Sequence, residues 1–98
     1  MAWTVEFHHD VADDLDHLGA AAALKILKVI EEKIENGEPD KLGIRLSGSL
    51  AGSRRIRVGD TRIVYKVDMG AVEVLIVAVG ARRDKEVYHA AKKRLSKI

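Results

Sequence analysis

Arginines gather on one short stretch of this sequence, and their spacing decides what chemistry they can do. Between Gly52 and Val67, two runs of alternating apolar and basic residues flank Gly59-Asp60. A Gly-X pair between such runs predicts a β-hairpin with a two-residue type II′ turn. With that turn, Arg57 lies opposite Arg62, and Arg55 shares their face while the other face is apolar. Guanidinium groups side by side repel one another, so this face is either well solvated or built to bind a polyanion.

Other kinds of active site find little support in the residue types. The sequence has no cysteine, which excludes a disulfide framework, a thiol nucleophile and a thiolate metal site. His8, His9 and His17 lack the spacing of a helical metal site, so we expect no metal cofactor. No nucleophile motif surrounds a serine, and Gly43 and Gly48 have P-loop spacing without the lysine that a P-loop needs. Arginines and tyrosines remain as the candidate functional groups.

Length and charge narrow the class of partner. The 98 residues suffice for one domain with a single core, and we expect residues 1–98 to form it. No stretch is long enough for a membrane span and the start lacks the layout of a signal peptide, so we expect a cytoplasmic protein. Residues 1–40 carry a net charge of −7 and residues 41–98 carry +9. The basic part would attract a phosphate backbone and the acidic part would repel it, which favours one orientation on a nucleic acid.

The segments that must position the arginines read as an α+β domain. Alternating apolar residues predict a strand over residues 3–7, and helical spacing predicts helices from Asp10, as N-cap, to Gly19 and from Ala20 to Asn36. Residues 41–52 are expected to be a loop, and the β-branched run Val72–Val79 predicts a strand covered on both faces. We therefore expect an N-terminal strand and an antiparallel two-helix hairpin packed on one face of a largely antiparallel four-stranded sheet, then a short C-terminal helix. The opposite face is expected to be free and basic.

The helix periodicity also predicts which side chains enter the core. The apolar stripe of the second helix consists of Ala23, Leu24, Leu27, Ile30 and Ile34. A last helix would begin after Asp84, with Val87, Ala91 and Leu95 turned inward and Lys92, Lys93, Arg94 and Lys97 outward. We expect Trp3 and Tyr65 to be core aromatics rather than platforms for base stacking.

Three segments resemble one known family in their order and spacing. They are residues 54–58, 62–65 and 79–88, and the last is the most specific, because its basic residues follow a buried strand and Gly80 and lead to Val87-Tyr88. Together they resemble the strands and C-terminal segment of RelE-type toxins of the RelE/ParE superfamily, over almost the whole chain. The resemblance implies the toxin of a type II toxin-antitoxin system, a ribosome-dependent endoribonuclease that cuts mRNA without a metal or small-molecule cofactor. It also implies a cognate antitoxin that wraps and neutralises the toxin.

The resemblance further implies roles for individual side chains. RNA cleavage without a metal proceeds by attack of the ribose 2′-hydroxyl on the adjacent phosphate, and it needs a proton acceptor, a proton donor and positive charge on the transition state. Arg57, Arg62 and Arg82 would supply that charge. Tyr88 would stack on a base or accept the proton, its pKa lowered by neighbouring arginines. Further contacts to RNA are expected from Arg45, Arg54, Arg55, Arg83 and Lys92.

One departure from the family affects the acid–base chemistry. Better-known members carry lysines on the first hairpin strand where this sequence has Arg55 and Arg57, and arginine does not give up its proton. Either Tyr88 is then the base, or catalysis rests more on charge and positioning. The alternative within the superfamily is a ParE-type toxin, which inhibits DNA gyrase without cutting RNA; such relatives tend to lack the constellation that Arg82 and Tyr88 represent. A third interpretation is a basic RNA-binding module without catalysis.

Overall fold

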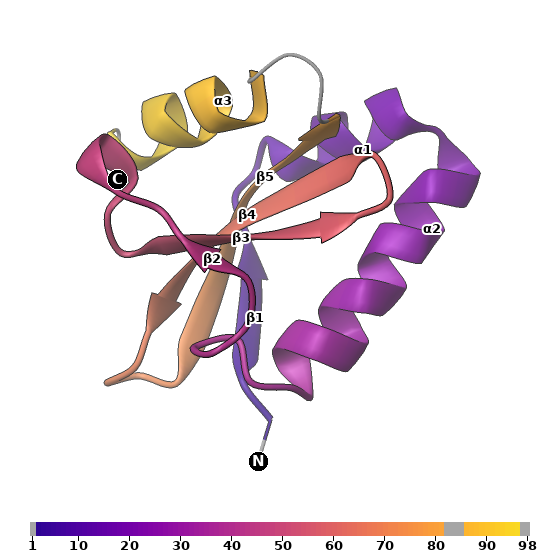
Figure 1. Cartoon of the computed structure of the whole chain (residues 1–98). Coiled ribbons are helices and arrows are strands. Elements are labelled where there is room, and N and C mark those ends of the chain that lie inside the picture. Colours follow the sequence, from indigo (N-terminus) through magenta and orange to yellow (C-terminus); the bar gives the residue numbers. More distant parts are fainter. Residues whose placement is uncertain (1, 82–85, 97–98) are drawn as a thin grey trace.

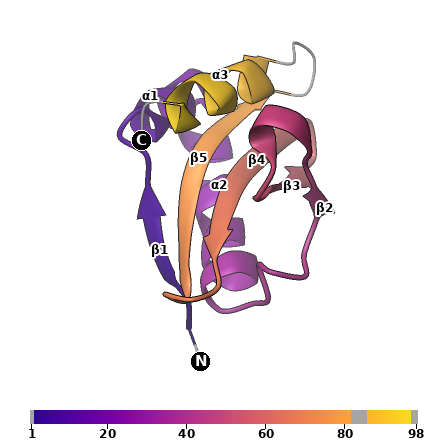
Figure 2. The ribbon, with the colours of Figure 1, turned by 90° about the vertical axis from the view of Figure 1, so that its left-hand side faces the viewer.

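A mixed five-stranded sheet forms the centre of the protein, with helices on both of its faces (Figures 1 and 2). The computed structural model describes residues 2–81 and 86–96. The strands are β1 (Thr4–Phe7), β2 (Ile44–Arg45), β3 (Ser53–Val58), β4 (Thr61–Asp68) and β5 (Glu73–Ala81), in the sheet order β1-β5-β4-β3-β2. β1 runs parallel to β5, and the other neighbours are antiparallel. The expected count of four strands was wrong by one, because the segment predicted as a loop contributes β2.

Three α-helices and two shorter helical segments complete the fold. They are α1 (Val11–Leu18), α2 (Ala20–Val29), the π-helical η1 (Ile30–Glu35), the 3-10 turn η2 (Gly48–Leu50) and α3 (Glu86–Leu95). Gly19, with φ +90°, joins α1 to α2 in the predicted two-helix hairpin, and η1 continues α2 to the predicted end. Among the described residues, no helix has the length and apolar character that a membrane span requires. The predicted N-terminus of α3 at Asp84 lies outside the described residues.

The larger part of the core lies between α2, η1 and the sheet. Its helical side consists of Val11 on α1 and the row Ile26, Ile30 and Ile34, all nearly inaccessible to solvent. The predicted stripe was partly wrong, because Leu24 is 69% exposed and Leu27 is 38% exposed. The row of isoleucines recurs every four residues and lies flat on the sheet, which leaves the two leucines on the flank of the helix.

Tyr65 is a core aromatic, as predicted. Its side chain is fully buried on the α2 side of β4, and its hydroxyl lies 2.9 Å from the carbonyl oxygen of Pro39 and 3.1 Å from that of Leu42. Burial raises the pKa of Tyr65 to about 12. The buried hydroxyl thus ties the segment between η1 and β2 to the centre of the sheet. Trp3, directly before β1, packs against the same core and is partly buried.

A β-bulge places two neighbouring apolar residues of β5 on the same face of the sheet. Val64 pairs with Ala78, but the next residue, Tyr65, pairs with Ile76, so Val77 is an extra residue on β5. As a result, Val77 and Ala78 both pack under α3, together with Val87 and Ala91 from that helix. The prediction that the strand over Val72–Val79 is covered on both faces is confirmed for β5. The expectation of a free second face holds only toward β3, because α3 covers the part over β4 and β5.

Tyr65→Phe is expected to lower the free energy of unfolding by about 1–2 kcal/mol, because the buried carbonyl of Pro39 loses its donor. The measurement is urea denaturation at neutral pH. Tyr88→Phe is the matched control, since it removes the same atom from a ring that is only partly buried. Equal losses in the two variants would contradict the role given to the Tyr65 hydroxyl.

Candidate functional site

The β3–β4 hairpin pairs in the register that the sequence predicted. Val58 lies opposite Thr61 and Arg57 lies opposite Arg62, across a two-residue turn in which Gly59 has φ +59°. Positive φ at the first turn residue alone is the type II′ pattern. Because side chains alternate along a strand, Arg55, Arg57 and Arg62 share the face on which α3 lies. The hairpin thus gathers three guanidinium groups beside that helix.

Gly80 allows α3 to approach these arginines closely. It pairs with Arg62 across the β4–β5 ladder, and a Cβ atom at Gly80 would lie 3.2 Å from the Cβ of Val87. Val87 is buried in this space, and the next residue, Tyr88, reaches the arginines. The Tyr88 hydroxyl accepts hydrogen bonds from Arg62 Nη1 at 2.5 Å and from Arg55 Nη1 at 3.0 Å. The guanidinium carbon of Arg62 also lies 5.7 Å from the centre of the Tyr88 ring.

The electrostatics of this cluster favour an ionised phenol. Burial raises the pKa of Tyr88, but the hydrogen bonds and charges of Arg55 and Arg62 outweigh burial, so the pKa lies below its ordinary value. None of the ion pairs found among residues 2–81 and 86–96 involves Arg55 or Arg62. Their Nε atoms are buried and lack a hydrogen-bond partner within those ranges. The two positive charges are therefore held together without a described acidic neighbour, and an anion with several acceptor oxygens suits such a site.

The other predicted site residues are placed at different distances from this cluster. Arg57 is exposed near the hairpin turn, on the same face. Arg45 and Arg54 pair across β2 and β3 and therefore lie on the opposite face, where Arg54 Nε donates to the carbonyl of Leu42 at 2.7 Å. Lys92 is exposed on α3. Arg82 and Arg83 lie outside the described residues.

Arg55 has a closer relation to Tyr88 than the sequence suggested. It was predicted as a contact to RNA, and the structure adds its direct hydrogen bond to the Tyr88 hydroxyl. The signal was present in the hairpin register, which put Arg55 on the same face as Arg62. Its nearness to Tyr88 depends on the packing of α3, which the spacing of α3 residues did not reveal.

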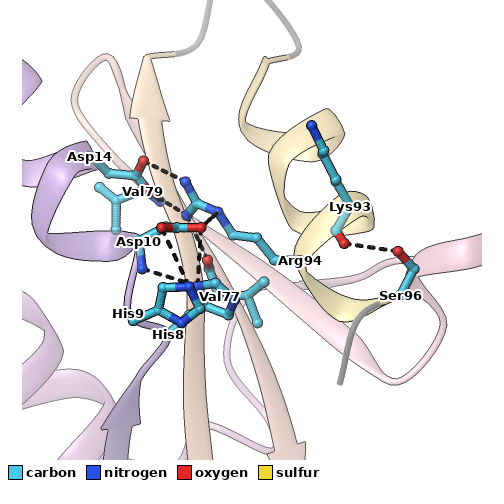
Figure 3. Close-up of polar contacts among 9 residues, drawn as sticks. All are labelled: His8, His9, Asp10, Asp14, Val77, Val79, Lys93, Arg94 and Ser96. Atoms are coloured by element: carbon cyan, nitrogen blue, oxygen red, sulfur yellow. Dashed lines mark hydrogen bonds and ion pairs between the residues drawn. The ribbon is translucent and has the colours of Figure 1, made fainter.

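The prediction that Arg94 points outward from α3 was wrong. Its side chain is 13% exposed and forms hydrogen bonds to the carboxylate of Asp14 on α1 (Figure 3). The reason is tertiary, because a buried acceptor on another helix draws in a residue that helical spacing alone assigns to solvent. Asp10 precedes α1 as predicted but makes no side-chain cap; its carboxylate faces His8, His9 and Arg94 instead.

Three potential metal ligands lie together at the start of α1. Donor-type atoms of His8, His9 and Asp10 lie within 4.8 Å of one another, a grouping that spacing rules did not predict. His8 Nδ1 already accepts a hydrogen bond from the backbone N–H of Asp10. The Asp10 carboxylate lies 3.8 Å from Arg94 Nε (Figure 3), and that positive charge disfavours a cation here. We therefore interpret the group as part of the surroundings of Arg94.

A groove of about 490 Å³ lies beside the arginines, between the α2–η1 helix and β2–β3. The apolar residues that line it are Val29, Leu42, Ile44, Ile56 and Val58, and the basic ones are Lys33, Arg55 and Arg57. Ile44 is 55% exposed. The groove thus follows β3, where apolar and basic residues alternate.

Known proteins provide an independent view of this fold. A sequence profile described as "ParE toxin of type II toxin-antitoxin system, parDE" matches residues 5–86. No curated protein sequence gives a significant match. The profile covers the first strand, both helices of the hairpin and the whole arginine-bearing hairpin.

Solved structures of toxins share the architecture. A chain of the toxin-antitoxin complex RelBE2 from Mycobacterium tuberculosis is 26% identical over 86% of this chain and 95% of its own, with a TM-score of 0.76. The E. coli toxin RelE in the free state, with two arginines replaced by alanine, is 25% identical over 97% of this chain and 99% of its own, with a TM-score of 0.77. The same E. coli mutant in complex with an antitoxin RelBc peptide is 24% identical over 93% and 95%, with a TM-score of 0.64. By its profile and its fold, the chain belongs to the ParE toxin family of type II toxin-antitoxin systems, within the RelE/ParE superfamily.

Proposed function

We propose that this toxin is a metal-independent endoribonuclease that cleaves mRNA on the ribosome. The main support for the proposal is the contact of Tyr88 with Arg55 and Arg62, in which the Tyr88 hydroxyl accepts a hydrogen bond from each guanidinium group. Each comes from a different element of the fold, α3, β3 and β4. A phenol beside two guanidinium groups supplies a proton acceptor and positive charge at one place, as cleavage by a 2′-hydroxyl requires.

The proposed reaction assigns a separate task to each kind of side chain. Tyr88 accepts the proton of the ribose 2′-hydroxyl as that oxygen attacks the adjacent phosphorus. The bond from phosphorus to the 5′-oxygen breaks, and the departing oxygen takes its proton from water. Arg55 and Arg62 stabilise the added negative charge on the phosphate oxygens, where planar guanidinium groups bind well. Arg57 extends the positive surface along the same face and would bind a neighbouring phosphate. Arg82 keeps its proposed role on the strength of the resemblance alone.

A cognate antitoxin is part of the proposal. The E. coli neighbour is described in complex with an antitoxin peptide. The groove between α2–η1 and β2–β3 suits an amphipathic segment, because both apolar residues and the basic residues Lys33, Arg55 and Arg57 line it. Acidic residues on such a segment would cover the arginines of the site. The proposed targets, mRNA and the ribosome, set the activity in the cytoplasm.

The profile match favours a second candidate function, inhibition of DNA gyrase by a ParE-type toxin. The two functions leave different products in a cell. A nuclease leaves cut messages, whereas a gyrase inhibitor blocks replication and leaves messages whole. The resemblance of residues 79–88 favours the nuclease, since ParE-type relatives tend to lack the constellation that Arg82 and Tyr88 represent.

Arg62→Ala is expected to slow mRNA cleavage by about 10²–10³-fold, because one of the guanidinium groups proposed to stabilise the transition state is lost. The measurement is single-turnover primer extension on a message held by purified ribosomes. Lys28→Ala is the control, since it removes one exposed positive charge from α2, on the other side of the sheet. Equal rates for wild type and Arg62→Ala would contradict the assignment, and growth arrest with intact messages would favour gyrase as the target.

The two tyrosines are expected to ionise in separate steps. Tyr88 ionises below the free-tyrosine value of about 10, and Tyr65 ionises only near pH 12. The near-ultraviolet absorbance of tyrosinate measures both steps, and Tyr88→Phe should abolish the lower one. If Tyr88 is the base, the cleavage rate rises about tenfold per pH unit up to its pKa, because the ionised form becomes more populated. A pH-independent rate over that range would exclude Tyr88 as the base.

A further inference from the structure

We propose that Arg94 is a positioning residue, which fixes α3 against α1 and β5 and thereby holds Tyr88 against Arg55 and Arg62. Arg94 lies at the C-terminal end of α3, six residues after Tyr88, which corresponds to about 9 Å along the helix axis. It touches none of the groups to which we assign chemistry. Its effect on the site would pass through the placement of the helix.

The contacts of Arg94 join three elements of the fold (Figure 3). Its Nη1 donates to Asp14 Oδ2 at 2.7 Å and to the carbonyl of Val77 at 2.9 Å, and its Nη2 donates to Asp14 Oδ1 at 2.9 Å. Asp14 Oδ2 also accepts the backbone N–H of Val79 at 3.0 Å. Both side chains are largely buried, with 13% and 16% of their surface exposed. The pair therefore links α3 to α1 and attaches both helices to β5.

The position of this pair follows from the end of β1. The parallel ladder between β1 and β5 stops where Phe7 lies opposite Ile76. The carbonyl of Val77 and the N–H of Val79 follow directly on β5, and buried backbone groups need partners. Asp14 and Arg94 supply those partners. The pair thus takes the place of a strand neighbour, at a site fixed in the backbone.

Directional contacts position a helix more sharply than apolar ones. Val87 and Ala91 bury α3 against the sheet, but apolar burial depends on area and permits small shifts and rotations. A bidentate arginine–carboxylate contact fixes both the distance and the relative orientation of the two side chains. Hydrogen bonds from two arginines to one phenol oxygen require such placement, since they weaken steeply when distance or angle changes.

An apolar contact could also join helix and sheet, and apolar replacements of buried ion pairs are often neutral or stabilising. Here such a replacement would leave the carbonyl of Val77 and the N–H of Val79 without partners, so the pair both satisfies these backbone groups and fixes the helix. The inference rests on the proposed function for its kinetic readout only, because the contact of Tyr88 with the arginines can be measured without RNA.

The test compares Arg94→Gln with Lys93→Gln. Both remove one positive charge from the same turn of α3, but Lys93 is exposed and takes no part in the contacts between Arg94, Asp14 and β5. In folded Arg94→Gln, we expect the Tyr88 pKa to rise toward that of free tyrosine and kcat for mRNA cleavage to fall about 10–100-fold. KM for programmed ribosomes should change little. Lys93→Gln should match wild type in the tyrosine titration and in kcat.

Arg94→Lys keeps the charge but loses the two-pronged contact, and it should give intermediate values of both quantities. It decides the question by the same readouts if Arg94→Gln does not fold. A wild-type Tyr88 titration and kcat in a folded Arg94 variant, with only a lower free energy of unfolding, would overturn the proposal. If the wild-type toxin cleaves no RNA, the proposed function fails, and the tyrosine titration still decides the role of Arg94.

Discussion

The close approach of α3 to the sheet at Gly80 is the constraint on which the site depends. Without a side chain at that position, Val87 packs against β5, and Tyr88 reaches across to Arg62 and Arg55. The hairpin alone would hold a row of mutually repelling arginines. The helix alone would carry a tyrosine with an ordinary environment. Their contact brings side chains from elements far apart in the sequence into one hydrogen-bonded cluster.

Among the described residues, acidic side chains pair with Arg94 and not with the arginines that contact Tyr88. The N-terminal part of the chain holds most of the negative charge, yet Asp14 and Asp10 face Arg94, and none of the ion pairs among the described residues involves Arg55 or Arg62. Arg94 thus has its counter-charge on α1. Arg55 and Arg62 have no ion-pair partner among the described residues, and we propose that they bind a phosphate or acidic residues of an antitoxin. The arginines differ in their partners, because Arg94 binds a carboxylate whereas Arg55 and Arg62 bind the hydroxyl of Tyr88.

Local signals predicted the hairpin and its register, because a two-residue turn with Gly59 fixes every cross-strand pair that follows. The boundaries of the two-helix hairpin followed from glycines and periodicity. Errors arose where tertiary contacts decide. Leu24 is exposed because the row Ile26, Ile30 and Ile34 faces the sheet instead, and Arg94 is largely buried because it binds Asp14 on α1. The short β2 was missed since two residues have no detectable period. The Arg55–Tyr88 contact joins residues 33 apart, which no local pattern can show.

The chemistry of the cut ends tests the central claim most directly. Attack by a 2′-hydroxyl, with Tyr88 as the base and the arginines as the charge, joins the 2′-oxygen to the phosphorus and expels the 5′-oxygen. Message isolated after incubation with ribosomes and the toxin should therefore carry 2′,3′-cyclic phosphate and 5′-hydroxyl ends. Messages that stay whole, or fragments that carry 5′-phosphates from attack by water, would contradict the account.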